Sequence, residues 1–368
     1  MNRMSVLPHR RTFVVNGRFM GRPVTGVERF AHETLRALDQ AMPHALPHTE
    51  LLVAVPQGVP DKLGLKHGRV VQVGRRQGHA WEQMELARFR PELPLLNLCN
   101  TAPLRRTGQL VVIHDAAVFA LPQAYSWRFR LAYRVLHRLL AHSAARILTV
   151  SAFSQQELAR HLNVPAERIG VLAAGGDHML RVTPDDGVLD RHGLRQRPYV
   201  LAVSSNHLGK NFAVVAQAML RLQRPDFDVV IAGGLNHAVF SRSEQSLPPF
   251  IKRVGYVSDG ELNSLYQHAA VFVFPSVYEG FGLPPLEAMT LGCPVVSSHA
   301  ASMPEVCGDA AVYFDPHDPD ACVRALDQVM KSGQAGRQDL GARSLARSKE
   351  WSWQRAAQAL AHHLKEMA

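Results

Sequence analysis

Residues 275–289 read PSVYEGFGLPPLEAM, and the rest of the chain is best interpreted outward from this stretch. The apolar run Val271–Phe274 comes directly before it and is typical of a buried β-strand. Glycines and then two prolines follow, which predicts a tight turn and a helix with proline in its first turn. Gly292 ends that helix, and Pro294-Val295-Val296 begins another strand. The stretch therefore predicts strand, turn, helix and strand, the alternation found in α/β proteins.

Two carboxylates, Glu279 in the turn and Glu287 in the helix, lie eight positions apart. A helix start presents free backbone N–H groups and the positive end of a dipole, which suits a phosphate group. A carboxylate can accept hydrogen bonds from two hydroxyl groups at once. The combination indicates a ligand that carries both phosphates and hydroxyls, and a sugar nucleotide has both.

The pattern from Glu279 to Glu287 around GFGLPPLEAM resembles the signature of family 4 of the retaining, nucleotide-sugar-dependent glycosyltransferases. The resemblance covers most of the chain in the family's order, through the short motifs TGVERF, WEQ, His114-Asp115, SAFS, GKN and MPEV. It implies the GT-B fold, which is α/β with two Rossmann-like parallel-sheet domains facing a central cleft. In that fold a C-terminal helix crosses back to the first domain.

Strand and helix patterns alternate through both halves of the chain, as the resemblance implies. We expect an N-terminal acceptor-side domain over 1–185, a C-terminal nucleotide-sugar-binding domain over 186–350, and the crossing helix over 351–368. The polar segment 183–198 is the expected linker. Strands are expected over 12–16, 51–55, 70–73, 95–98, 110–113, 147–150, 199–203, 229–231 and 271–274, and helices over 26–38, 127–145, 212–222, 261–268 and 354–364.

The composition is that of a water-soluble globular protein. The chain has 368 residues, of which 46% are hydrophobic and 20% charged. No apolar run approaches the roughly 18 residues of a membrane span, and the N-terminus lacks a secretory signal pattern. Its four cysteines are scattered, which favours reduced thiols over disulfides and gives no support to a metal cluster. We expect a cytoplasmic protein.

The net charge is +10, and most of the excess lies in the first half. Residues 1–190 contain 24 Lys and Arg against 15 Asp and Glu, whereas the remainder contains 17 against 16. A basic half suits an anionic partner such as lipid headgroups, a lipid pyrophosphate or nucleic acid, or it is only a decorated surface. The sequence shows none of the common nucleic-acid-binding patterns, which disfavours the third partner.

The resemblance places the donor near the signature. Glu287 would accept hydrogen bonds from the ribose hydroxyls, and Glu279 would face the hydroxyls of the donor sugar. Lys210 would stabilise the departing diphosphate, whose negative charge grows as the sugar–phosphate bond breaks. Backbone groups of the loops complete the expected donor site, with contributions from Gly26, Gly280, Phe281, Gly282 and Leu283.

One position departs from the family's pattern. Members often carry an Arg beside the lysine, but the residue before Lys210 is Gly209. His207 or an Arg elsewhere is an open alternative for the second cation. No DxD metal motif occurs in a convincing setting, so we expect catalysis without a metal cofactor.

His114 ends an apolar strand, at the sheet edge where α/β folds bind ligands. By resemblance it contacts the donor sugar near the reacting carbon. Asp115 is expected either to act as a base or to orient its loop. Arg18 and Arg22, in the loop before Gly26, are expected to meet an anionic acceptor.

The segment 127–140 is rich in basic and aromatic residues. Arg130, Arg134, His137 and Arg138 are expected on one helical face with leucines opposite. This basic face is interpreted either as solvated or as resting on anionic lipid at the inner leaflet of the plasma membrane.

The resemblance implies a retaining glycosyltransferase that adds a sugar to a lipid-linked or polysaccharide acceptor in cell-surface glycan synthesis. WEQ, His114-Asp115 and GKN look most like mannosyl-type members, so GDP-mannose is the expected donor. A related GT-B enzyme that uses a UDP- or dTDP-sugar is one alternative, and a non-catalytic nucleotide-sugar-binding subunit is another. In the expected mechanism the acceptor hydroxyl attacks on the face from which the diphosphate leaves.

Overall fold

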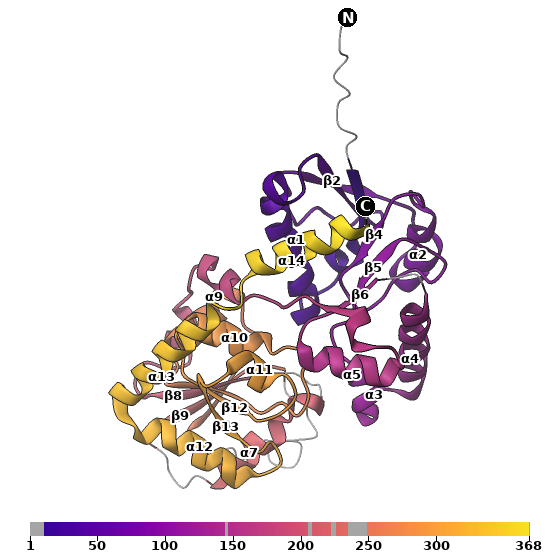
Figure 1. Ribbon diagram of the computed structural model, residues 1–368. Coiled ribbons are helices and arrows are strands. Elements are labelled where there is room, and N and C mark those ends of the chain that lie inside the picture. Colours follow the sequence, from indigo (N-terminus) through magenta and orange to yellow (C-terminus); the bar gives the residue numbers. More distant parts are fainter. Residues whose placement is uncertain (1–10, 144–145, 205–207, 222–225, 235–248, 368) are drawn as a thin grey trace, which may run out of the picture. The chain divides into compact units, whose positions relative to one another are not determined.

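The computed structural model describes residues 11–143, 146–204, 208–221, 226–234 and 249–367. The chain divides into two compact units (Figure 1), and each is described by itself. The first unit comprises Met1–Ala120, Ser126–Ala174 and Trp353–Ala368, and the second comprises Leu121–Tyr125 and Gly175–Ser352.

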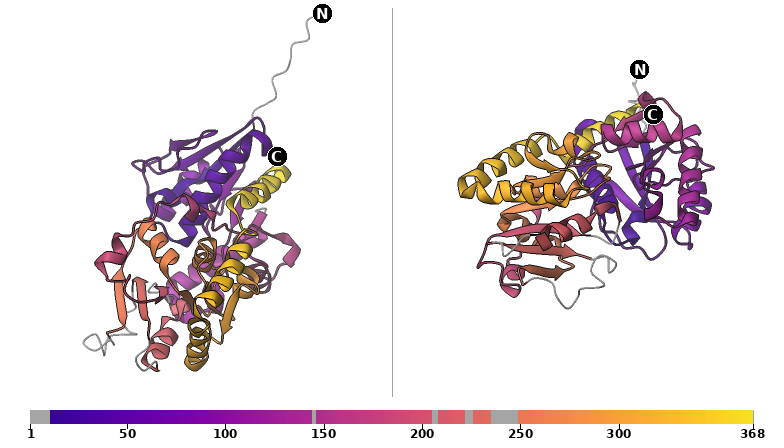
Figure 2. Two further views of the ribbon diagram at one scale, coloured as in Figure 1. Left: turned by 90° about the vertical axis from the view of Figure 1, so that its left-hand side faces the viewer. Right: turned by 90° about the horizontal axis from the view of Figure 1, so that it is seen from below.

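The first unit is built on a seven-stranded parallel sheet in the order β3-β2-β1-β4-β5-β6-β7. Helices pack around this sheet in the views of Figure 2. The strands are β1 Arg11–Asn16, β2 Thr49–Val55, β3 Gly68–Gln72, β4 Leu95–Asn97, β5 Gln109–Val112, β6 Arg146–Thr149 and β7 Ile169–Val171. The helices are α1 Gly26–Ala45, α2 Gly78–Met84, α3 Ala117–Ala120, α4 Trp127–His142, α5 Ala152–Leu162 and α14 Trp353–Met367.

The second unit is built on a six-stranded parallel sheet in the order β10-β9-β8-β11-β12-β13. Its strands are β8 Tyr199–Ser204, β9 Asp228–Gly233, β10 Ile251–Gly255, β11 Val271–Phe274, β12 Val295–Ser298 and β13 Ala311–Phe314. Its helices are α6 Gly187–Arg191, α7 Phe212–Arg221, α9 Asp259–His268, α10 Leu283–Thr290, α11 Met303–Cys307, α12 Pro319–Lys331 and α13 Gly333–Ser348. Two parallel sheets in an α/β chain confirm the expected Rossmann-like architecture.

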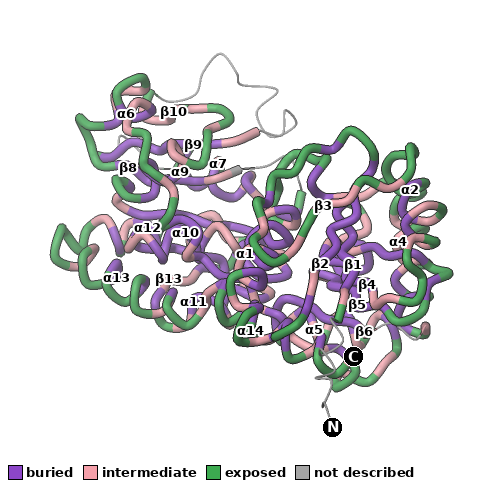
Figure 3. The backbone as a smooth tube through the Cα atoms, turned by 90° about the horizontal axis from the view of Figure 1, so that it is seen from above, coloured by how far each residue is buried: buried purple, intermediate pink, exposed green. Residues whose placement is uncertain are grey.

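The central strands are buried because helices cover their sheets (Figure 3). All four residues of β5 and all four of β11 are buried, which explains why both read as unbroken apolar or nearly apolar runs. In the second unit the core gathers around β8, β9 and β11 with α7 and α12. Each sheet therefore holds its own hydrophobic core.

Helix α14 lies in the first unit and packs along α1. The rings of Phe30 and Trp353 meet edge to face with centroids 5.9 Å apart, and both side chains are buried. The apolar positions of the C-terminal segment thus form one buried stripe at helical spacing.

The segment 183–198 is not the linker expected from its composition. It contains the short helix α6, and the side chains of Val188, Leu189 and Leu194 are buried in the second unit. The division between the units falls between Ala174 and Gly175, eleven residues before the expected boundary. Polar residues alternate here with buried apolar ones, so composition alone was a poor guide.

Both sheets contain a point where the chain order reverses, between β1 and β4 in the first and between β8 and β11 in the second. In open parallel sheets ligands bind outside the carboxyl ends of the strands at this topological switch point. The loops that follow these four strands are therefore the places to search for function. No described helix has the length and the apolar composition that crossing a bilayer requires.

Candidate functional site

The signature stretch folds as predicted, with β11 ending at Phe274 and α10 beginning at Leu283. Gly282 is the N-cap of α10 and has a φ of +105°, which residues other than glycine rarely adopt. A Cβ atom at this position would lie 2.3 Å from Cε of Met303. Glycine is therefore required here both by backbone conformation and by close packing.

The turn before α10 exposes a row of backbone donors. The N–H groups of Phe281, Gly282 and Leu283 make no hydrogen bond to any other residue that the structure describes. Pro284 and Pro285 have no N–H at all, so these three groups are the donors that the helix start offers. Their arrangement suits an anion or a hydroxyl oxygen.

Ser302 holds the turn in this shape. Its hydroxyl lies 3.0 Å from the carbonyl oxygen of Glu279 and 2.9 Å from that of Phe281. Because these carbonyls are fixed on one side, the neighbouring N–H groups are preorganised on the other.

Lys210 and Glu279 meet at the switch point of the second sheet. Nζ of Lys210 lies 2.7 Å from Oε1 of Glu279, and both side chains are partly exposed. The ammonium group also lies 5.1 Å from the centre of the Phe274 ring. A lysine has three N–H donors, so this pair leaves donors free for a phosphate oxygen.

Asn211 ties the lysine loop to the signature loop. It has a φ of +49°, and its amide nitrogen donates to the carbonyl oxygens of Pro275 at 3.2 Å and Pro316 at 2.6 Å. The N–H of Val277 in turn donates to the carbonyl oxygen of Gly209 at 2.9 Å. The GKN motif thus places its lysine by means of its asparagine. His207, the suggested second cation, lies outside the described residues.

Glu287 is buried one turn inside α10, not in the first turn of the helix. Nε2 of His178 donates to its Oε1 at 3.1 Å, and Oη of Tyr266 lies 3.4 Å from its Oε2. All three side chains are buried. This pairing compensates the carboxylate inside the protein and sets its orientation.

Sequence reasoning missed His178, which lies 109 residues before Glu287. Gly176 brings it there, because a Cβ atom at Gly176 would lie 2.3 Å from Oγ1 of Thr290 and 2.9 Å from the Leu286 carbonyl oxygen. Backbone can approach α10 this closely only at glycine. The Gly-Gly-Asp-His sequence at 175–178 indicates a turn followed by a polar residue, but nothing in its spacing identifies Glu287 as the partner of His178.

In the first unit, His114 lies just beyond β5 with its side chain buried. Nε2 lies 2.9 Å from the carbonyl oxygen of Leu98, so Nε2 carries the proton and Nδ1 is an acceptor. The Phe30 ring packs edge to face against the imidazole at 4.7 Å. Burial lowers the pKa of His114 to about 4, so the ring is neutral near pH 7.

Asp115 shapes its own loop. Its Oδ1 accepts a hydrogen bond of 2.8 Å from the N–H of Ala117 at the start of α3. This is the second of the two roles that the sequence left open for it. A role as a base is not tested by this contact.

Gly26 is the first residue of the 20-residue helix α1, and a Cβ atom there would meet nothing within 4 Å. The N-cap is Thr25, whose N–H donates to Oε2 of Glu28 at 3.3 Å in a capping box. Oε1 of Glu28 pairs with Nη1 of Arg22 at 3.1 Å. Glu28 therefore takes part in the helix cap and also pairs with Arg22.

Arg18 belongs to a buried polar cluster at the switch point of the first sheet. Its Nε lies 3.2 Å from Oε2 of Glu82, and its Nη2 donates to Oγ1 of Thr101 at 2.7 Å. Asn16, at the end of β1, donates to the same Glu82 oxygen at 3.0 Å. Removing one partner of such a buried ion pair typically costs about 3–5 kcal/mol. Glu82 is the glutamate of WEQ, a motif to which the sequence assigned no chemistry.

The electrostatics of Glu82 follow from these contacts. Burial by itself raises the pKa of its carboxyl group. Hydrogen bonds from His79, Thr101 and Asn16, together with the Arg18 charge, outweigh burial and hold that pKa below its usual value. Glu82 is therefore an anion at neutral pH, and Arg18 is its counter-ion.

Helix α4 does not present the single basic face that the sequence predicted. His137 is buried with its Nε2 3.0 Å from the carbonyl oxygen of Asn100, and Arg134 donates to the carbonyl oxygens of Val118 and Phe119 at 2.9 and 3.2 Å. Two of the four basic residues thus face the protein, because they satisfy carbonyl groups there. Arg130 is half-buried.

The outer face of α4 carries the apolar side chains instead. Trp127, Leu131, Val135 and Leu139 follow each other at four-residue spacing, and their exposed fractions are 63%, 57%, 46% and 50%. Arg138 is exposed beside them, with its guanidinium 5.8 Å from the Phe119 ring. We call these four residues the α4 stripe.

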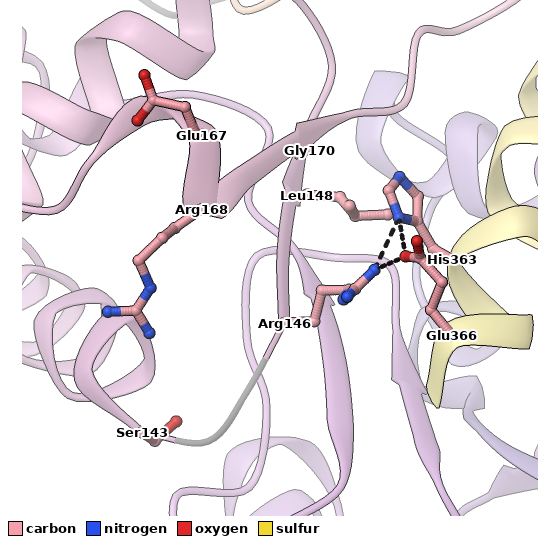
Figure 4. A pocket seen from close by; sticks show the side chains of 8 residues that line it. All are labelled: Ser143, Arg146, Leu148, Glu167, Arg168, Gly170, His363 and Glu366. Carbon is pink, nitrogen blue, oxygen red and sulfur yellow. Dashed lines mark hydrogen bonds and ion pairs between the residues drawn. The ribbon is translucent and has the colours of Figure 1, made fainter. Parts of the chain in front are cut away.

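A separate cavity of about 540 Å³ lies in the first unit (Figure 4). Nη1 of Arg146 lies 3.2 Å from Nδ1 of His363 and pairs with Glu366, and these three side chains point toward one another. Arg168 points away from them. None of the residues expected in the donor or acceptor site lines this cavity. Arg146, the arginine that lies among the three facing side chains, is already paired with Glu366.

Comparison with known proteins decides the family. The family described as Glycosyl transferases group 1 matches residues 190–346. The O-antigen chain mannosyltransferase B of Escherichia coli is 32% identical, over 90% of this chain and 93% of that protein. The chain belongs to the group 1 glycosyltransferases.

Two further similarities agree with this membership. The serotype-specific mannosyltransferase WbdA of Escherichia coli is 41% identical over 103 residues, which are 28% of this chain and 12% of that protein. The structure of Anabaena Alr3699/HepE in complex with UDP-glucose has a TM-score of 0.72 and 18% identity, and the match covers 97% of this chain and all of that one. The second similarity concerns the fold alone, and it confirms the expected GT-B class.

In its second unit this group 1 glycosyltransferase brings Lys210 into contact with Glu279 of the signature. Lys210, Glu279 and the free N–H groups of the turn come from loops after β8 and β11, and Glu287 follows in α10. In the first unit His114 and Asp115 follow β5, while Gly26 opens α1. Arg134 and Arg138 lie on α4, where Arg134 donates to the carbonyl oxygens of Val118 and Phe119.

Proposed function

We propose that this glycosyltransferase moves mannose from GDP-mannose, with retention of configuration, onto a lipid-linked or polysaccharide acceptor in cell-surface glycan synthesis. The Lys210–Glu279 pair beside the unbonded N–H groups of the turn is the observation that carries the proposal. The names of the relatives, which are O-antigen chain and serotype-specific mannosyltransferases, support the choice of sugar and pathway.

The chemistry requires stabilisation of a leaving group. The acceptor hydroxyl forms a bond to the anomeric carbon while the bond from that carbon to the diphosphate breaks, and the hydroxyl proton passes to a phosphate oxygen. Lys210 supplies a positive charge and the turn supplies N–H donors for the diphosphate. Glu279 accepts from hydroxyls of the sugar, and Glu287 accepts from the ribose. These residues position the donor and offset its developing charge.

Residues of the first unit also have roles in the proposed reaction. The neutral His114 has an acceptor nitrogen at the carboxyl edge of the sheet, where a sugar hydroxyl can meet it. Asp115 keeps the loop beside it in place. No atom lies within 4 Å of the place that a Cβ of Gly26 would take, which supports a role for this glycine at the start of α1 in substrate binding.

The α4 stripe supports docking of the protein on an anionic membrane surface. Exposed apolar side chains in a row, with arginine beside them, are typical of helices that lie in the membrane interface. This differs from the expected arrangement, in which arginines alone would have made the contact.

The test is a transfer assay with labelled donors and a panel of neutral octyl glycosides as acceptors. The wild-type protein should transfer mannose from GDP-mannose, and Lys210→Ala and Glu279→Ala should each lower kcat about 10²- to 10³-fold. Lys331→Ala is the matched control, because Lys331 is an exposed lysine that pairs with a carboxylate on α12. The control should leave kcat unchanged.

The donor panel separates the alternatives. Transfer from a UDP- or dTDP-sugar but not from GDP-mannose would show that the donor assignment is wrong. Ligand-induced stabilisation by a nucleotide sugar without transfer to any acceptor would indicate a non-catalytic binding subunit. Equal activity of wild type and Lys210→Ala would contradict the proposed site.

A further inference from the structure

We propose that Trp351 is a positioning residue of the donor site, because it holds Phe281 and with it the row of N–H donors in the turn before α10. The inference rests on the proposed function, in which these N–H groups meet the diphosphate. Trp351 stands at the start of the segment that was expected to cross to the first domain. Helix α14 begins only at Trp353, however, and Trp351 belongs to the second unit, as the turn does.

The turn has few side chains that can fix its position. Phe281 lies between Gly280 and Gly282, and glycines leave the backbone free to adopt many conformations. Glycine also contributes no side chain to packing, whereas Phe281 is buried, with only 6% of its surface exposed. Together with the Ser302 hydroxyl, the buried Phe281 ring therefore sets the direction of the N–H groups at 281–283.

The ring of Trp351 packs directly on this phenylalanine. The two ring centroids are 5.5 Å apart and the ring planes stand at 87°, which is the favourable edge-to-face arrangement. The indole is itself fixed, because its Nε1 donates to the carbonyl oxygen of Val306 at 3.1 Å. The backbone N–H of Trp351 donates to the carbonyl oxygen of Ser348 at 3.0 Å. A ring held in this way keeps Phe281 in one orientation.

Helix α11, which contains the MPEV motif, makes a second connection between Trp351 and the turn. At the start of this helix the Ser302 hydroxyl bonds two carbonyl oxygens of the turn. At its end the carbonyl oxygen of Val306 accepts from Nε1 of Trp351 and from Nε of Arg347, each at 3.1 Å. The Arg347 guanidinium also lies 5.6 Å from the centre of the Trp351 ring. The motif thus joins Trp351 and Arg347 to the turn.

A change at Trp351 should therefore affect the part of the donor that meets the turn and spare the ribose, which meets Glu287. The experiment measures inhibition of transfer from GDP-mannose by GDP and by guanosine, which has the base and the ribose but no phosphate. Trp351→Leu should raise the inhibition constant of GDP about tenfold or more, because the N–H groups no longer point at the phosphate. That of guanosine should change less than about twofold. Where the donor is a UDP- or dTDP-sugar, the nucleoside diphosphate and nucleoside of that base take the place of GDP and guanosine.

Matched variants separate positioning from general stability. Trp351→Phe keeps an aromatic ring against Phe281 and should recover most of the GDP affinity. Arg347→Gln removes the second hydrogen bond to Val306 and should weaken GDP about threefold or more. Arg343→Gln is the control, because Arg343 lies one turn earlier on α13 and bonds Asp339 and the carbonyl oxygen of Asp309 instead. Both inhibition constants should be unchanged in the control. Trp351→Phe and Arg347→Gln carry the test where Trp351→Leu does not fold.

Two results would overturn the inference while wild-type transfer upholds the proposed function. If the inhibition constants of GDP and guanosine rise by the same factor in Trp351→Leu, the tryptophan only stabilises the unit. If neither constant changes, the turn keeps its shape without it. Absence of transfer by the wild-type protein from every donor would overturn the proposed function and this inference with it.

Discussion

Among single residues, Glu287 shows how a role depends on a partner that lies far away in sequence. Its carboxylate has one oxygen fixed by His178 and the other close to Tyr266. A buried carboxylate without such partners would be protonated or would turn toward water. His178 is therefore a positioning residue in the proposed donor site.

The variant His178→Leu should raise KM for the donor at least fivefold with a smaller change in kcat, because Glu287 loses the hydrogen bond that orients it. His178→Gln is the conservative control, since its amide nitrogen can donate from nearly the same place. The measurement is the ratio of kcat/KM for the donor and for its 2′-deoxyribose analogue. This ratio should shrink in His178→Leu and recover in His178→Gln. An unchanged ratio would mean that His178 only fills space.

In the proposed function, Lys210 and the N–H groups of the turn stabilise the leaving diphosphate, and this leads to a prediction about metals. Purified protein in excess EDTA should keep its full transfer rate. Loss of activity in EDTA, restored by Mn²⁺ or Mg²⁺, would show that a metal ion stabilises the leaving diphosphate together with Lys210. Among the described residues no three His, Cys, Asp or Glu side chains gather as a metal site, but this does not replace the measurement.

At the level of secondary-structure elements, helix α4 shows that its sequence pattern alone does not decide which of its faces packs against the protein. Its sequence places arginines and leucines on different faces, and either face can be turned inward. Carbonyl groups of Val118, Phe119 and Asn100 need donors, and Arg134 and His137 provide them. That requirement turns the α4 stripe outward.

The α4 stripe predicts binding to vesicles. Liposomes with about 30% phosphatidylglycerol should sediment the wild-type protein, and the triple variant Leu131→Ser/Val135→Ser/Leu139→Ser should bind at least tenfold more weakly, because it loses apolar area. Leu345→Ser on α13 is the control, since Leu345 is also an exposed leucine on a helix. Equal sedimentation of the triple variant and wild type would contradict membrane docking through α4.

On the scale of the whole molecule, the first unit contains buried neutral histidines that make its stability depend on pH. Burial lowers the pKa of His114 and of His137 to about 4. An unfolded histidine has a pKa near 6.5, so the unfolded chain binds more protons between these values. The stabilising contribution is complete above pH 6.5 and is lost as pH falls toward 4.

The free energy of unfolding should drop by about 2 kcal/mol per histidine between pH 7 and pH 5. The check is the thermal unfolding midpoint at both values. His137→Leu should show a smaller difference between pH 7 and pH 5 than wild type, because one titrating group is gone. His362→Leu removes an exposed histidine as the control. If His137→Leu has the same pH dependence as wild type, His137 is not protonated on unfolding in this range.

Much of the fold follows from local patterns. The strand at 271–274 was predicted without error, and the starts of α1 and α4 were predicted to the residue. These features depend on burial runs, caps, glycine and proline, whose effects act within a few residues. The prediction that the segment 183–198 is a linker was wrong, because its few buried apolar residues stand among many polar ones.

The sequence motifs, above all the signature stretch, determined the family and the α/β class, because turn glycines, prolines and carboxylates at fixed spacing leave few other structures. They also predicted the donor-side residues. Only the tertiary structure decided which charges remain free. The pairs His178–Glu287 and Arg18–Glu82 join segments that no short-range rule connects. Strand order brings them together, and the cost of burying an unpaired charge keeps them there.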